Sequence, residues 1–167
     1  MKIALLGTRG IPASHGGFET CVEEIGWRLA KAGHDVWVYS RTSEYSKRQN
    51  SYKGMRIIQI PRPRLKGIET LFSTFISVIH SLLLLFDFHM VFNAANSPAL
   101  IVYKLLQKKY ALNTDGLEWK RDKWGFCARS YYKLSEHIAI SLCKNIVTDS
   151  EAMQRYYSMK YNAQSTV

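Results

Sequence analysis

The sequence predicts an α/β fold of the Rossmann-like, doubly wound type: a single domain with a parallel sheet and helices on both of its faces. Short apolar runs alternate with longer amphipathic segments along almost all of the 167 residues, which is the pattern of parallel strands joined by helices. The connecting segments are long enough for right-handed crossovers. Apolar residues make up 47% of the chain, which favours an ordered core.

The first elements are a buried strand at residues 2–6, a glycine-rich turn at residues 7–17, and a helix that ends at Gly33. Strands are expected at residues 34–40 and 55–60, with a polar loop at residues 41–54 between them. Proline at positions 61 and 63 stops the later strand. The apolar face of the helix consists of residues spaced by three and four: Phe18, Val22, Ile25, Leu29 and Ala32.

The apolar run at residues 71–86 predicts a long helix, from about residue 68 to about residue 85. The run has sixteen residues and several hydroxyl groups, whereas a membrane-spanning helix needs roughly 20 mostly apolar residues. We therefore expect this helix to be buried against the sheet. A helix lying on a membrane surface is the alternative, because Arg62, Arg64 and Lys66 precede it.

The second half of the chain continues the alternation. Pro98 is placed in the first turn of a helix that runs to about residue 108, and Asp149 or Ser150 is expected to cap the last helix. Strands are expected at residues 90–94, 110–114 and 145–148, helices at residues 126–143 and 151–159, and the start of a further strand at residues 165–167.

In parallel α/β sheets, ligands bind beyond the carboxyl ends of the strands. This rule places three segments at one edge of the predicted sheet: residues 8–17, 93–97 and 115–124.

The glycine turn at residues 7–17 has the composition of an anion-binding turn. Glycines allow the backbone to approach a ligand, and the start of the following helix offers unpaired N–H groups. The spacing matches neither G-x-G-x-x-G nor a P-loop. A turn that needs glycine torsions and binds nothing is the alternative. His15 lies among these glycines, whereas the other four histidines are interpreted as structural.

The loop at residues 115–124, DGLEWKRDKW, combines acids, cations and tryptophans directly after a strand. Asp115 stands where a general base would be useful. Trp119 and Trp124 have the shape to stack on a sugar or to rest at a lipid interface. Lys120, Arg121 and Lys123 suit a diphosphate. The alternative is that the tryptophans pack in the core and the charges pair with one another.

The formal net charge of +10 indicates anionic partners or simply a soluble basic surface. Nucleic acid is not expected, because cations and aromatics interleave in only one loop. The three cysteines have no metal-ligand spacing, so we expect no bound metal and a reducing, cytoplasmic environment. We see no secretory signal at the start of the sequence.

Two sets of residues carry a resemblance to a known family. Gly16-Gly17-Phe18-Glu19, followed by a helix and by GHDV at residues 33–36, resembles the start of glycosyltransferase family 4, which has the two-domain GT-B fold. The tryptophan loop, with Glu136 and VTDS at residues 147–150, resembles the N-terminal domain of bacterial rhamnosyltransferases, long catalogued as a domain of unknown function. This resemblance covers essentially the whole chain.

The resemblance implies a hexosyltransferase of cell-surface polysaccharide synthesis. The donor would be a nucleotide-sugar such as dTDP-rhamnose, with no other cofactor. The acceptor would be a glycan or a lipid-linked glycan, with possible peripheral contact at the cytosolic face of the plasma membrane. Residues 1–167 would form the N-terminal, acceptor-side domain. Because the C-terminal nucleotide-sugar-binding domain is absent from the sequence, we expect the chain alone to be inactive.

The resemblance also implies roles for particular residues. Gly16 and Gly17 would face the donor diphosphate, with Arg9 from the same turn. Asp115 and His15 are the catalytic candidates, although many relatives have a histidine where this chain has Asp115. The candidate acceptor-binding residues are Asn93, Glu118, Trp119, Lys120, Arg121, Lys123 and Trp124.

Two other functions remain open from the residues. Arg41 follows the second strand, where an arginine that binds NADP is found in some oxidoreductases. The net positive charge also fits a non-catalytic module that binds anions or membranes.

Overall fold

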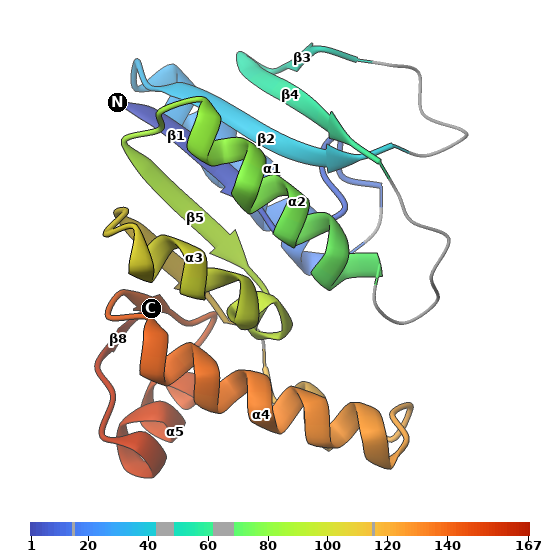
Figure 1. The fold of residues 1–167 in the computed structure, drawn as a ribbon, viewed down its shortest axis with the longest axis vertical. Helices are drawn as coiled ribbons and strands as arrows, with labels where there is room; N and C mark the ends of the chain where they lie inside the picture. The colour runs from blue at the N-terminus through green and yellow to red at the C-terminus, as the bar shows by residue number, and fades with distance from the viewer. Residues whose placement is uncertain (15, 43–48, 62–68, 115) are drawn as a thin grey trace. The chain divides into compact units, whose positions relative to one another are not determined.

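A computed structural model describes residues 1–14, 16–42, 49–61, 69–114 and 116–167 (Figure 1). Eight strands form a mostly parallel sheet in the order β3-β4-β2-β1-β5-β6-β7-β8. The predicted Rossmann-like α/β class is confirmed. The chain divides into two compact units, Met1–Met90 and Val91–Val167, and each is described by itself.

The first unit contains β1 and the two strands that follow it in the sheet. β1 pairs in parallel with β2, with Leu5 opposite Val38, and β2 pairs in parallel with β4. The elements are β1 (Lys2–Leu6), α1 (Gly17–Lys31), β2 (Asp35–Arg41), β3 (Ser51–Tyr52), β4 (Met55–Ile60), α2 (Glu69–Leu83) and the start of β5 (Phe88–Phe92).

The prediction that residues 41–54 form only a loop is wrong at its C-terminal end. β3 pairs antiparallel with β4 through a two-residue turn, Lys53 and Gly54, whose φ angles are 47° and 79°. Two consecutive positive φ angles are typical of a tight hairpin turn. The sequence offered little sign of it, because lysine is an uncommon residue at such a torsion.

Helices α1 and α2 cover opposite faces of the sheet in this unit. A Cβ added at Gly26 of α1 would lie 3.2 Å from Leu5, so Leu5 and its partner Val38 face α1. Tyr39, the next residue of β2, points to the other face, where its hydroxyl lies 3.1 Å from Nδ1 of His80 in α2. The predicted helices on both faces are therefore present here.

The buried side of α1 differs from the predicted apolar face. The buried residues are Glu19, Val22, Glu23 and Gly26, and only Val22 belongs to the expected set. Glu19 and Glu23 are each 9% exposed. Burying two carboxylates is unfavourable unless they accept hydrogen bonds, and their partners lie in the glycine turn described below.

Helix α2 packs against the sheet, as expected, but the side that it buries is polar. Its buried residues are Ser73, Thr74, Ser77, Val78 and Ser81. Ser77 and Ser81 donate to the carbonyls of Ser73 and Val78, both at 2.7 Å, which satisfies hydroxyls that would otherwise be costly to bury. The large apolar side chains instead point outward, with exposed fractions between 43% and 76%: Phe72, Phe75, Ile79 and Leu83.

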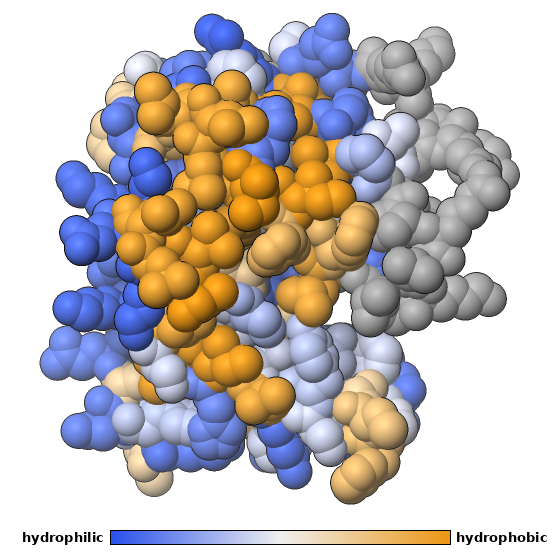
Figure 2. Space-filling model, viewed as in Figure 1, coloured by the Kyte–Doolittle hydropathy of each residue, from blue (hydrophilic) through white to orange (hydrophobic). Residues whose placement is uncertain are grey.

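Figure 2 shows hydrophobic side chains gathered over α2 on the face in view. Among the residues that the structure describes, no helix is both long enough and apolar enough to cross a membrane.

The second unit begins within β5. The predicted strand at residues 90–94 lies two residues too late, and the segment around Pro98 is a 3-10 helix before it becomes α-helical. Asn93 starts that helix by accepting a hydrogen bond from the N–H of Ala95. The elements are η1 (Ala94–Ala99), α3 (Leu100–Leu105), β6 (Tyr110–Asn113), η2 (Glu118–Lys120), α4 (Phe126–Leu142), β7 (Ile146–Val147), α5 (Glu151–Tyr161) and β8 (Ser165–Thr166).

Packing in the second unit centres on α4. Ser97 donates to the carbonyl of Ser135 at 2.5 Å, and Tyr131 donates to the carbonyl of Ala95 at 2.6 Å, so η1 is fastened to α4. Ser150 caps α5 by accepting from the N–H of Met153, as one of the two predicted caps. β6, β7 and β8 are parallel, and the predicted strand at the end of the chain is present.

Candidate functional site

Carboxylates of α1 hold the glycine turn of residues 7–17. The N–H of Arg9 donates to Glu19 Oε1 at 3.0 Å, and the N–H of Ala13 donates to Glu23 Oε2 at 2.8 Å. The N–H of Ile11 donates to Ser40 Oγ at 3.1 Å. In the first part of the turn, these N–H groups therefore donate to side chains of the same unit and do not point to a ligand.

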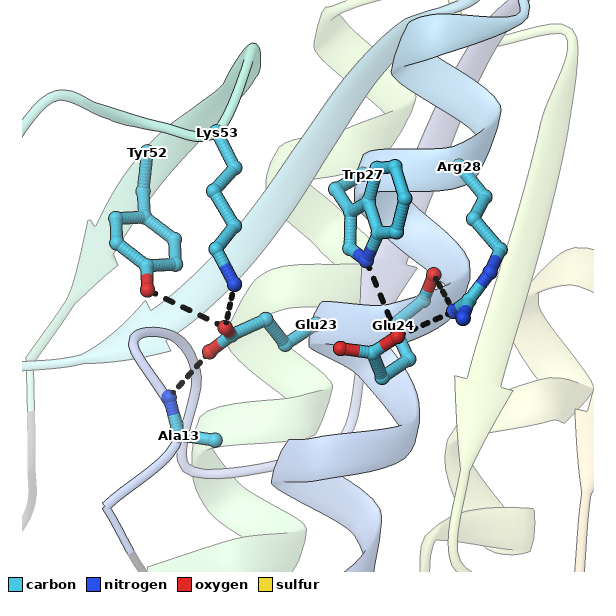
Figure 3. Close-up of polar contacts among 7 residues, drawn as sticks. All are labelled: Ala13, Glu23, Glu24, Trp27, Arg28, Tyr52 and Lys53. Carbon is cyan, nitrogen blue, oxygen red and sulfur yellow. Dashed lines mark hydrogen bonds and ion pairs between the residues drawn. The ribbon is translucent and has the colours of Figure 1, made fainter.

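Glu23 also ties the β3–β4 hairpin to the turn (Figure 3). Lys53 Nζ lies 2.6 Å and the Tyr52 hydroxyl 3.2 Å from Glu23 Oε1. The hydrogen bond from Ala13, followed by that from Lys53, holds the pKa of Glu23 below its ordinary value, against the opposing effect of burial. The neighbouring Glu24 points away from the turn and accepts hydrogen bonds from Trp27 and Arg28 (Figure 3).

Two glycines of the turn have steric reasons to be glycine. Gly10 has a φ of 110°, and a Cβ there would lie 2.1 Å from Ser40 Oγ. Gly16 has a φ of 102°, and a Cβ there would lie 2.3 Å from Glu19 Oε2. A Cβ at Gly17 would meet nothing within 4 Å. Of the residues proposed to face a diphosphate, Arg9, Gly16 and Gly17 are all exposed to solvent.

The tryptophan loop surrounds a small pocket in the second unit. Of the predicted acceptor-binding residues, Asn93, Glu118 and Trp119 line it together. Ala94, Gly116, Tyr132, Glu136 and Tyr157 complete the lining.

Glu118 organises one side of the loop. It accepts a hydrogen bond from Trp124 Nε1 at 2.9 Å and forms ion pairs with Arg121 at 2.7 Å and Lys123 at 3.6 Å. The ring of Trp124 also lies 5.2 Å from that of Tyr132, centre to centre. Two of the three cations proposed to meet a diphosphate are therefore already paired with a carboxylate.

Glu136 of α4 anchors the other side. It is 4% exposed, and it accepts hydrogen bonds from four donors on the loop and on α5. They are Trp119 Nε1 at 3.1 Å, Tyr156 OH at 2.7 Å, Lys160 Nζ at 3.0 Å and Tyr161 OH at 2.5 Å.

The ionisation of Glu136 follows from this environment. Burial raises the pKa of Glu136, but the hydrogen bonds outweigh it, so that the pKa lies below its ordinary value. Glu136 is consequently a carboxylate at neutral pH and holds the loop, α4 and α5 together. Glu136 was part of the sequence resemblance, but no role was predicted for it. Tyr132 and Tyr157, which also line the pocket, gave no sequence signal beyond their positions in helices.

The remaining predicted residues lie elsewhere. Both catalytic candidates, His15 and Asp115, lie outside the described residues. The same is true of the basic residues Arg62, Arg64 and Lys66. Within the described ranges, His, Cys, Asp and Glu side chains form no group of three that could hold a metal ion. The expectation that the glycine turn and the tryptophan loop share one edge stays a prediction.

The fold and these two loops define the chain as a Rossmann-like α/β domain with polar loops after its strands. The family model described as "Domain of unknown function (DUF1972)" matches residues 1–167, and the chain belongs to that family. No curated protein sequence matches the chain.

Among solved structures, a sucrose-phosphate synthase from Thermosynechococcus elongatus is similar. The TM-score is 0.64 at 15% sequence identity, over 100% of this chain and 87% of that one. At this identity, the similarity establishes a shared fold.

Replacing Gly10 by alanine is expected to destabilise the protein, because the new Cβ would meet Ser40 at a backbone torsion that side chains avoid. We expect the free energy of unfolding to fall by about 2–3 kcal/mol, measured by urea denaturation. Gly17→Ala is the matched control and should leave stability unchanged or slightly higher. Equal stability of the two variants would contradict the packing described for the turn.

Glu136→Gln is expected to lower the free energy of unfolding by about 2 kcal/mol at pH 7, because the amide cannot accept all four hydrogen bonds. Since the pKa of Glu136 is lowered by folding, its contribution is complete above about pH 4.5 and is lost as the pH falls below that value. The difference between wild type and variant should therefore shrink on acidification. Glu151→Gln, at an exposed site, is the control and should cost less than about 0.5 kcal/mol. A difference that is independent of pH would argue against this role of Glu136.

Proposed function

We propose that the chain is the acceptor-side domain of a GT-B glycosyltransferase that moves a sugar from a nucleotide-sugar to a glycan or lipid-linked acceptor. The observation that carries the proposal is the set of side chains that gathers around the small pocket of the second unit. An indole wall, the phenol of Tyr132, two carboxylates and the Asn93 segment meet there. Aromatic faces with a few convergent polar groups suit the apolar faces and hydroxyls of a sugar ring.

The comparisons support the same class. The similar solved structure is that of a sucrose-phosphate synthase, and the GT-B resemblance of the sequence is compatible with that fold. We propose rhamnose, from dTDP-rhamnose, as the sugar transferred. Gly16 and Gly17, at the end of the glycine turn, would contact the donor diphosphate, and so would the exposed side chain of Arg9. His15 and Asp115 remain the proposed catalytic residues.

The activity would require a second domain for the nucleotide-sugar. Glycosyl transfer brings donor and acceptor together in one cleft, and holding both in register supplies much of the rate. Because the backbone N–H groups of Arg9 and Ala13 are used internally, backbone contacts to the donor would come from the later part of the glycine turn. The proposal therefore assigns the acceptor to the chain and most of the donor contacts to the second domain.

The exposed side of α2 supports a peripheral contact with an anionic membrane. Phe72, Phe75, Ile79 and Leu83 recur at steps of three and four on the outer side of the helix, which is the geometry of a helix that lies in an interface. The net charge of +10 disfavours pairing with a second copy and favours an anionic surface. A lipid-linked acceptor would be presented at such a surface.

Transfer can be tested by joining the chain to the donor-binding domain of a related two-domain enzyme and supplying several nucleotide-sugars with membrane-derived acceptors. We expect turnover, and we expect Trp119→Ala to lower kcat/KM about tenfold, since loss of one aromatic contact is worth on the order of 1 kcal/mol. Trp27→Ala is the control on α1. Absence of transfer with any donor, in a well-folded fusion, would refute the proposal, and tight NADPH binding would favour the oxidoreductase alternative.

Membrane contact can be tested by co-sedimentation with vesicles. Phe72→Ser with Phe75→Ser should reduce binding to phosphatidylglycerol vesicles at least tenfold, because each phenylalanine contributes on the order of 1.5 kcal/mol or more when buried. Phe126→Ser with Met159→Ser removes side chains that are 85% and 87% exposed and should have little effect. Equal binding of both variants, or a soluble dimer that only the α2 variant disrupts, would contradict the membrane assignment.

A further inference from the structure

Three lysines converge on the indole of Trp119. Lys133 Nζ lies 4.9 Å from the ring centre, and the Nζ atoms of Lys120 and Lys160 each lie 5.5 Å from it. The lysines come from different elements: Lys120 ends η2, Lys133 lies in α4 and Lys160 in α5. All three are exposed. The fold, rather than one run of sequence, therefore gathers these charges.

The positive charges of this cluster exceed the negative ones. Lys160 is paired with Glu136 at 3.0 Å. In the part of the chain that the structure describes, neither Lys120 nor Lys133 has a carboxylate partner. The cations on the other side of the loop differ, because Arg121 and Lys123 are both paired with Glu118.

This surplus has a physical consequence. Cation–π contact with one indole stabilises each ammonium only modestly, and ammonium groups held around the same ring repel one another. An anion with several oxygens and more than one charge would relieve that repulsion and accept hydrogen bonds from the ammonium groups. A single carboxylate would leave one of the two unpaired lysines without a partner charge.

We infer that Trp119, Lys120, Lys133 and Lys160 bind a phosphate or diphosphate group carried by the acceptor. Trp119 also lines the small pocket, so a sugar held against the lining side chains and the anion at the lysines would be adjacent parts of one molecule. The inference rests on the proposed function, and it adds a substrate class: a phosphorylated acceptor rather than a neutral glycan.

The test uses Lys120→Gln with Lys133→Gln, and it leaves Lys160 in place because that residue also supports Glu136. Lys31→Gln with Lys144→Gln is the matched control. It removes the same charge, and Lys31 likewise lies over a tryptophan, 5.9 Å from the ring centre of Trp27. Circular dichroism and thermal unfolding should confirm that both variants are folded.

Binding of inorganic pyrophosphate is measured by calorimetry on the chain itself, and the Trp119 indole N–H signal is followed by NMR after its assignment with Trp119→Phe. We expect the Kd to rise at least tenfold in the Lys120/Lys133 variant and less than twofold in the control, with the Trp119 signal shifted in the wild type. Equal affinity in the two variants, or no shift of the Trp119 signal, would overturn the site.

Vesicles containing a diphosphate-headgroup lipid distinguish the source of the anion. Loss of binding both to these vesicles and to pyrophosphate supports a lipid-linked acceptor, and loss of pyrophosphate binding alone supports a soluble phosphorylated one. Because no turnover is needed, intact pyrophosphate binding without glycosyl transfer would count against the proposed function only. Transfer without pyrophosphate binding would count against this site only.

Discussion

Buried carboxylates on helices that hydrogen-bond to neighbouring loops are the interaction on which the loops of both units depend. In the first unit, Glu19 and Glu23 of α1 accept from N–H groups of the glycine turn. In the second, Glu136 of α4 accepts from the tryptophan loop and from α5. A buried carboxylate is costly alone and becomes tolerable when several donors satisfy it. Each of these glutamates therefore holds its loop in place through the same hydrogen bonds that compensate for its burial.

This arrangement changes what each loop can offer a ligand. In the glycine turn, the N–H groups of Arg9, Ile11 and Ala13 are occupied, so an anion would have to bind backbone N–H groups of other residues in the turn. In the tryptophan loop, Glu118 pairs with Arg121 and Lys123, whereas among the described residues Lys120 and Lys133 beside Trp119 have no carboxylate partner. The groups that are best placed to bind a ligand are thus those that do not already pair with a carboxylate of the chain.

The outward orientation of the apolar side chains of α2 also depends on hydrogen bonding by buried polar groups. Its hydroxyls face the sheet because hydroxyls of serine can hydrogen-bond to carbonyls of the same helix, as Ser77 and Ser81 do. Small side chains also let a helix approach a sheet closely. The helix therefore places its phenylalanines outward while Ser77 and Ser81 are satisfied on the buried side, and a surface suited to a lipid interface results.

The sequence by itself determined the α/β class, the order of the elements and the position of the two loops after strands, because alternation and turn residues are local properties. Periodicity also located α1 and α2 to within a residue or two. It chose the wrong buried face for α1 and did not predict the buried face of α2, since each buried face depends on which neighbours satisfy Glu19, Glu23 and the serines. The gathering of Lys120, Lys133 and Lys160 around Trp119 was likewise decided only by tertiary structure, because these residues lie on three separate elements. The glycine turn was found from sequence, but its internal hydrogen bonds, and hence the part of it that a ligand can reach, required the fold.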